Sequence, residues 1–292
     1  MAVITNMATL TYSGGTVSSN VTQGELLTTL TATTVASSAT YAPGERITYV
    51  ISLVNTGTAA LTDLTVTDDL GAYEVGAVTR TPLTYVAGTL LYFVNGTPET
   101  APALEEGPPL VISGITVPAG GNIALVYTAV PNEFAPLAEG STLTNEIAVT
   151  GSGVACPVSA SETVSVREAP LLSIAKAMSP TVVTENGEVT YTFTVSNVGN
   201  EAAVATDNIV LSDTFDPRLG AITVTLNGEV LTAGTDYTYD EASGAFATAQ
   251  SRITVPAATF TQDPVTGEQT VTPGTATLTV TGTVLGCANP TP

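Results

Sequence analysis

RITYVISLVNTG, at residues 46–57, and EVTYTFTVSNVG, at residues 188–199, are two stretches in which apolar and polar side chains alternate. Alternation with a period of two is typical of a strand that buries one face. β-Branched and aromatic residues dominate both stretches and favour strands further. No window of helical length shows a comparable 3.6-residue period. The sequence therefore predicts an all-β protein.

These two stretches anchor an internal repeat. Each is followed by a segment with the pattern of a strand and an acidic residue near its end, LTVTDDL at 64–70 and IVLSDTF at 209–215. This alignment pairs Asp68 with Asp213. The two halves of the chain are therefore copies of one all-β unit.

The repeat continues through a hairpin and two more segments. Asn95-Gly96 and Asn227-Gly228 are hairpin signals between apolar runs. The later segments match in the same order, ITVP at 115–118 with ITVP at 253–256, and IALVYTAV at 123–130 with ATLTVTGTV at 276–284. We expect the first domain to span residues 26–167 and the second to span residues 168–292.

Only the first copy of the repeat carries a closing segment. LTNEIAVTGSGVACPVSASET ends it at 143–163, whereas the second copy runs into LGCANPTP. A close echo of the closing segment, ITNMATLTYSGGTVSSNVT, stands instead at residues 4–22. We expect residues 1–25 to be a donor segment that completes the second domain of a neighbouring molecule. Such a contact joins unlike surfaces and builds an open head-to-tail fibre.

Alternation also selects one face of this donor hairpin for burial. That face consists of Ile4, Asn6, Ala8, Leu10, Tyr12, Val17 and Val21, with Asn6 aligned to Asn145. Strand addition of this kind takes its affinity from main-chain hydrogen bonds and its specificity from alternate side chains. Two alternatives stay open, because residues 1–25 can also fold back onto the second domain of their own chain or pair loosely with the first.

SIAKAMSP, VTYTFTVSNVGN, IVLSDTF and the displaced TNMATLTY resemble the bacterial and archaeal repeats of the family called domain of unknown function 11. The resemblance covers both repeats, although the first has Thr34 near the place of the family's strand-A lysine. It implies two tandem immunoglobulin-like β-sandwich domains in a surface protein. Lys176 and Asn6 also resemble the lysine–asparagine pair of isopeptide-bonded immunoglobulin-like domains. Such a bond needs a nearby acid, for which Asp213 and Glu188 are the candidates.

Charge and residue types exclude several classes of function. Six basic residues stand against 26 acidic ones, a net charge of −20, which disfavours nucleic acids and anionic membranes as partners. The chain has no histidine and a single lysine, so neither a Ser-His-Asp nor a Cys-His catalytic arrangement can form. No stretch approaches the roughly 18 apolar residues of a membrane span. We expect no enzyme activity and no cofactor.

Two cysteines suggest a disulfide, and a few acidic residues suggest a calcium site. Cys156 follows the closing turn of the first repeat and Cys287 follows the last strand of the second, so an intersubunit disulfide is one hypothesis and two unpaired thiols are the other. Asp68-Asp69, and Asp213 with Asp216, are candidate calcium ligands because hard cations bind oxygen. Acids at turns and strand ends are the ordinary alternative.

The predicted function is that of a structural subunit of a pilus-like filament at an extracellular, cell-surface or spore-surface location. Its main partner is another copy of itself, with an anchor or tip protein in addition. The alternative is a monomeric surface adhesin or spacer that binds a ligand through its loops. Residues 1–10 lack the basic start and apolar core of a secretion signal, which leaves a removed leader or release of a spore protein by lysis.

Overall fold

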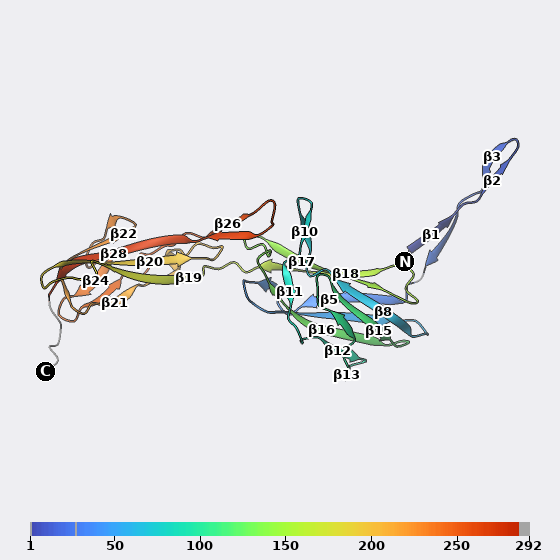
Figure 1. Cartoon of the computed structure of the whole chain (residues 1–292), viewed down its shortest axis with the longest axis horizontal. Helices are drawn as coiled ribbons and strands as arrows, with labels where there is room; N and C mark the ends of the chain where they lie inside the picture. The colour runs from blue at the N-terminus through green and yellow to red at the C-terminus, as the bar shows by residue number, and fades with distance from the viewer. Residues whose placement is uncertain (1, 27, 286–292) are drawn as a thin grey trace. The chain divides into compact units, whose positions relative to one another are not determined.

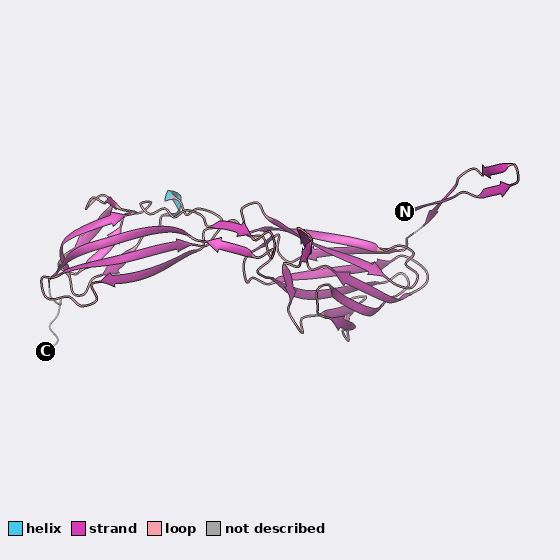
Figure 2. Ribbon diagram, turned by 45° about the horizontal axis from the view of Figure 1, so that its top comes forward, coloured by secondary structure: helices cyan, strands magenta, loops and turns pink. Residues whose placement is uncertain are grey.

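The computed structural model describes residues 2–26 and 28–285 (Figures 1 and 2). The one helix among these residues is a short 3₁₀ turn, η1 (Ala205–Asp207), drawn in cyan in Figure 2, and the other regular elements are all strands. The contacts form two compact units that divide between Val166 and Arg167, apart from the short segments 137–141 and 264–267. The structure confirms the predicted all-β fold with two tandem β-sandwich domains.

Residues 2–26 form a twisted β-hairpin, which we call the ribbon. Its four strands are β1 (Ala2–Asn6), β2 (Thr9–Tyr12), β3 (Gly15–Ser18) and β4 (Thr22–Leu26). β1 pairs antiparallel with β4, so that Asn6 lies opposite Thr22. β2 pairs with β3, which places Tyr12 opposite Gly15 across a turn at Ser13 and Gly14. Neither pair joins a larger sheet within the described residues.

The first domain packs two six-stranded sheets against each other. One sheet contains β5 (Leu30–Ala36), β7 (Ile47–Asn55), β11 (Leu83–Tyr85), β12 (Leu91–Val94), β13 (Thr97–Glu99) and β16 (Asn122–Pro131). The other contains β6 (Thr40–Tyr41), β8 (Leu61–Asp68), β14 (Ala103–Glu105), β15 (Leu110–Val117), β17 (Thr142–Thr150) and β18 (Val158–Val166). β9 (Tyr73–Val75) and β10 (Val78–Arg80) form a separate hairpin.

The strand order of the first domain places β7 inside one sheet, with its alternate side chains in the core. The first sheet runs β13-β12-β16-β7-β5, with β11 also paired to β16, and the second runs β14-β15-β8-β17-β18-β6. Alternate residues of the central strand β7 are buried, with Ile47, Tyr49, Ile51 and Leu53 at most 1% exposed. The period-two pattern of residues 46–57 is therefore the pattern of a strand with one face in the core.

The second domain pairs a five-stranded sheet with a smaller one. The larger sheet, in the order β19-β20-β28-β22-β23, contains β19 (Leu172–Ser179), β20 (Glu188–Asn197), β28 (Gly274–Val284), β22 (Leu219–Leu226) and β23 (Glu229–Val230). The smaller, in the order β21-β25-β24, contains β21 (Ser212–Thr214), β25 (Ala245–Thr248) and β24 (Tyr237–Asp240). β26 (Thr259–Gln262) and β27 (Gln269–Thr272) form a hairpin of their own.

Both predicted Asn-Gly hairpins are present. Asn95 and Asn227 have φ angles of 49° and 51°, and the glycines that follow have φ angles of 80° and 86°. Two successive residues with positive φ are what a tight two-residue β-hairpin turn requires. The turns join β12 to β13 and β22 to β23.

A buried asparagine fixes the correspondence between the two domains. The side-chain amides of Asn55 and Asn197 donate to the carbonyls of Ala59 at 2.9 Å and of Glu201 at 2.7 Å, each four residues further on. The Oδ1 atom of each accepts the amide two residues further on, at 2.9 Å in both domains. Counted back from these asparagines, residues of β7 and β20 match one for one.

Candidate functional site

The first domain contains its own closing hairpin, formed by β17 and β18. β17 pairs with β8, so that Ile147 lies opposite Asp68, and with β18 on its other side. One face of β17 enters the core: Leu143 is 3% exposed, and Asn145, Ile147 and Val149 are fully buried. The hairpin therefore supplies both a central piece of the sheet and part of the apolar core.

Within this hairpin, Asn145 joins a buried polar cluster. Its Nδ2 atom donates to Oδ2 of Asp68 at 3.1 Å and to the hydroxyl of Tyr127 at 3.0 Å. Tyr127 in turn donates to the same carboxylate oxygen. Burial raises the pKa of Asp68 to about 6, against the opposing effect of these hydrogen bonds. The Oδ1 atom of Asn145 has no hydrogen-bond partner in the described structure.

The second domain differs at the place that the closing hairpin takes in the first. In the first domain, β8 has β15 on one side and β17 on the other. β21, which carries Asp213, pairs with β25 on one side only. Its other edge has no strand partner within residues 167–285, where the second domain is described. An exposed edge of this kind presents unpaired main-chain groups to a further strand.

Strand β19 shows the same difference in side-chain burial. Asn55 lies opposite Leu30, and Asn197 opposite Leu172, so these two leucines match. Leu30 is 4% exposed, whereas Leu172 is 42% exposed. Ile174 and Met178, on the same face of β19, are also exposed. These three residues, which we call the β19 stripe, form an apolar surface that the second domain leaves uncovered.

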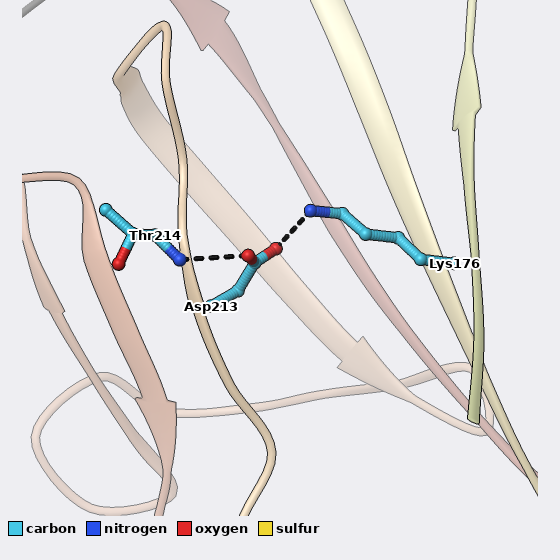
Figure 3. Close-up of polar contacts among 3 residues, drawn as sticks. All are labelled: Lys176, Asp213 and Thr214. Carbon is cyan, nitrogen blue, oxygen red and sulfur yellow. Dashed lines mark hydrogen bonds and ion pairs between the residues drawn. The ribbon is translucent and has the colours of Figure 1, made fainter. Parts of the chain in front are cut away.

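Lys176 lies in the middle of this stripe and forms an ion pair with Asp213 (Figure 3). It lies opposite Phe193, just as Thr34 lies opposite Ile51 in the first domain. Lys176 therefore occupies the position of the buried Thr34. The other oxygen of the Asp213 carboxylate accepts the amide of Thr214 at 2.9 Å, as Figure 3 shows.

Three aromatic rings surround the lysine. Its Nζ atom lies 4.7 Å from the ring centroid of Tyr191, 5.3 Å from that of Phe193 and 5.4 Å from that of Phe215. Phe193 and Phe215 are part of the buried core. The lysine thus lies over the edge of the core, where an added strand would remove it from water. The sequence does not distinguish these rings from ordinary core residues, because aromatic residues that alternate along a strand are typical of both.

Every described side chain of the ribbon is exposed to solvent. Its apolar residues Ile4, Leu10, Tyr12, Val17 and Val21 are between 51% and 64% exposed. Asn6 and Ala8, the remaining residues of the predicted donor face, are exposed as well. A hairpin of two strands with a bare apolar face is at most marginally stable alone. The ribbon therefore presents an uncovered apolar face.

The remaining candidate residues form no further cluster among those that the structure describes. Glu188 lies exposed at the start of β20, opposite Thr283, while Asp213 is the acid that pairs with Lys176. Cys156 is exposed, and Cys287 lies outside the described residues, so the disulfide stays a prediction. No group of three or more His, Cys, Asp or Glu side chains suited to a metal ion occurs in the described part of the chain, and this includes the acids considered for calcium.

No protein-family model and no curated protein matches this sequence. Several solved structures are distantly similar to this chain. The major pilin subunit BcpA of Bacillus cereus is 13% identical, with 93% of this chain and 73% of that chain covered and a TM-score of 0.35. The full-length major pilin SpaD of Corynebacterium diphtheriae is 11% identical, covers 76% of this chain and 49% of that chain, and has a TM-score of 0.36.

A third likeness is to the collagen-binding domain of a Staphylococcus aureus adhesin, which is 13% identical, with 48% of this chain and 98% of that domain covered and a TM-score of 0.28. At these TM-scores the function has to be inferred from the chain's own residues. Among the described residues, no helix has the length and apolar character to cross a bilayer.

Proposed function

We propose that this chain is a structural, non-enzymatic subunit of a pilus-like filament on a cell or spore surface. Each copy inserts its ribbon into the second domain of the next copy and so builds a head-to-tail homopolymer by donor-strand complementation. The observation that carries the proposal is the difference between the domains. The first has a closing hairpin beside β8, the second has a bare edge at β21, and the ribbon repeats the sequence of that hairpin.

The side-chain pattern of the ribbon supports this fit. Ile4, Asn6 and Leu10 align with Leu143, Asn145 and Val149, which are at most 3% exposed in the first domain. Insertion would cover these residues and the β19 stripe at the same time. About eight half-exposed apolar side chains would gain roughly 1 kcal/mol each, which is half of the value for full burial. The main-chain hydrogen bonds of a new strand pair at β21 would add to that sum.

Preformed pairing lowers the cost of insertion. Immobilising a free segment of this length costs ~1–2 kcal/mol per residue in lost backbone freedom. In the structure β1 is already paired with β4, and β2 with β3, so part of this loss precedes binding. Because the ribbon and the β21 edge are different surfaces, the contact is heterologous and a chain of copies extends without limit unless it closes into a ring.

The decisive experiment compares the full chain with a chain that lacks residues 2–22. We expect negative-stain microscopy to reveal fibres of the full chain and none of the truncated chain, while circular dichroism confirms that the truncated chain keeps its β-structure. Truncated protein that still forms fibres would show that another interface drives assembly. Full-length protein that stays monomeric would favour the surface adhesin or spacer, or closure of each second domain by its own ribbon.

A further inference from the structure

We propose that each junction of the filament is sealed by an amide bond between Lys176 of one copy and Asn6 of the next, formed with the help of Asp213. This inference rests on the donor-strand function proposed above. It gives a role to the single lysine of the chain, whose side chain stays 41% exposed in the second domain. Three pairs of matching positions, in the first domain on one side and in the second domain and the ribbon on the other, support it.

The first two pairs come from strand register and alignment. Thr34 and Lys176 match because they lie opposite Ile51 and Phe193, which occupy the same place on β7 and β20. Asp68 and Asp213 match in the repeat alignment. The first domain thus has an acid but no lysine at this place, and the second has both.

The third pair is Asn145 and Asn6, which align within the closing segment and the ribbon. In the first domain, Nδ2 of Asn145 lies 3.1 Å from Oδ2 of Asp68. In the second domain, Nζ of Lys176 bonds to a carboxylate oxygen of Asp213, the acid that matches Asp68. An inserted ribbon that follows the register of β17 would therefore bring the carboxamide of Asn6 and the amine of Lys176 to one carboxylate group, that of Asp213. Amine and carbonyl carbon would then be close enough to react.

The surroundings of this place favour the reactive protonation state. An amine is a nucleophile only when it is neutral. Removing water from an ammonium–carboxylate pair disfavours both charges, so the proton moves from the ammonium to the carboxylate. The rings of Tyr191, Phe193 and Phe215 already exclude water from one side of Lys176. An inserted strand would cover the side that is still exposed.

The first domain shows what such covering does to the acid. With its closing hairpin in place, Asp68 is fully buried and its pKa is raised to about 6 by burial. A carboxyl group in that environment can hold a proton near neutral pH and return it to a leaving group. The side chain of Asp213 is 20% exposed in the free chain and would be covered in the same way only after the ribbon is inserted, which restricts the reaction to assembled junctions.

The reaction balances without any further reactant. Asp213 takes one proton from the ammonium of Lys176, and the freed amine attacks Cγ of Asn6. A new C–N bond forms and the bond from Cγ to Nδ2 breaks. The protonated acid supplies one proton to the departing nitrogen, and the attacking nitrogen loses its second proton to the ammonia that is released. An ammonium side chain and a carboxamide thus give a secondary amide and an ammonium ion. No oxidant, reductant or metal enters the balance.

The test uses full-length fibres boiled in detergent with a reductant, which removes any disulfide. We expect a ladder of covalent oligomers, and a joined peptide that contains Asn6 and Lys176 and is lighter than the sum of its parts by one ammonia. Lys176→Arg keeps the positive charge over the rings but has no amine nucleophile, so its fibres should separate into single chains. Asp213→Asn and Asn6→Ala should also abolish the joined peptide.

Matched controls and microscopy separate this inference from the proposed function. Glu188→Gln changes the other acid that the sequence offered, and Asn20→Ala changes an exposed asparagine of the same ribbon. Both should leave the ladder intact. Wild-type fibres that dissolve entirely into single chains, with no joined peptide, would overturn the amide and leave donor-strand assembly standing. If Asp213→Asn forms the amide as fast as the wild type, the role of the acid is wrong. Absence of fibres in every form would remove both proposals.

Discussion

Replacing Leu10 of the ribbon by alanine should weaken each junction without unfolding either domain. Leu10 is 64% exposed in the ribbon, whereas Val149, the residue that it matches, is fully buried. Moving such a leucine out of water contributes ~1–2 kcal/mol, about two thirds of the value for complete burial. The hole that alanine leaves in the neighbour's core raises the loss to about 2–4 kcal/mol. That loss corresponds to a roughly 30- to 700-fold larger dissociation constant.

The assay must be made where assembly is reversible, so we choose the Lys176→Arg background in the presence of a reductant. Sedimentation then gives the critical concentration for polymer formation, which follows the dissociation constant of one junction. Thr11→Ala is the matched control, because Thr11 lies on the opposite face and makes an exposed hydroxyl contact with Thr16 at 3.2 Å. Its effect should stay within about threefold. Equal critical concentrations for the two variants would refute the assignment of the buried face.

Three further predictions concern the acceptor surface, pH and the cysteines. Ile174→Ser should leave the stability of the monomer unchanged, because the side chain is 59% exposed, but raise the critical concentration roughly tenfold; an unchanged critical concentration would mean that the ribbon does not cover the β19 stripe. Burial raises the pKa of Asp68 from 3.8 to about 6, so the folded first domain keeps a proton that the unfolded chain has lost between these pH values. Its contribution to the free energy of unfolding therefore falls by about 2–3 kcal/mol as the pH rises from below 4 to above 6, and urea titrations should find this part of the slope missing in Asp68→Asn; equal slopes would contradict the shift. On a non-reducing gel, Lys176→Arg fibres should show a ladder of oligomers that a reductant removes, and adding Cys156→Ser should abolish that ladder. A ladder that persists in the double variant would rule out a disulfide between Cys156 and Cys287.

Much of the fold could be predicted from local pattern. The alternation in residues 46–57 and 188–199 predicted the strands that the structure contains as β7 and β20. The Asn-Gly pairs predicted two hairpins, and both have the expected positive φ angles. These features depend on the chemistry of a few neighbouring residues. The echo between residues 4–22 and 143–163 also identified a hairpin in the ribbon, because turn residues and alternation are again local signals.

The lysine site could be predicted only in part. The sequence named Lys176 and Asn6 but could not choose between Asp213 and Glu188, since the choice depends on which strand faces β19 across the sandwich. The structure brings Asp213 to the lysine and leaves Glu188 exposed. It also adds Tyr191, Phe193 and Phe215, which come from β20 and from the segment after β21. Contacts between strands distant in sequence carry no local signal.

An electron cryo-microscopy map of the assembled state, with the chain traced across one junction, would show whether the ribbon of one copy is inserted in the next. We expect residues 4–12 of one copy to lie beside β21 of the next, with Leu10 in its core and the side chain of Asn6 at Asp213. A map in which the same chain covers its own β21 edge, or in which the ribbon stays in solvent, would rule out donor-strand insertion between copies.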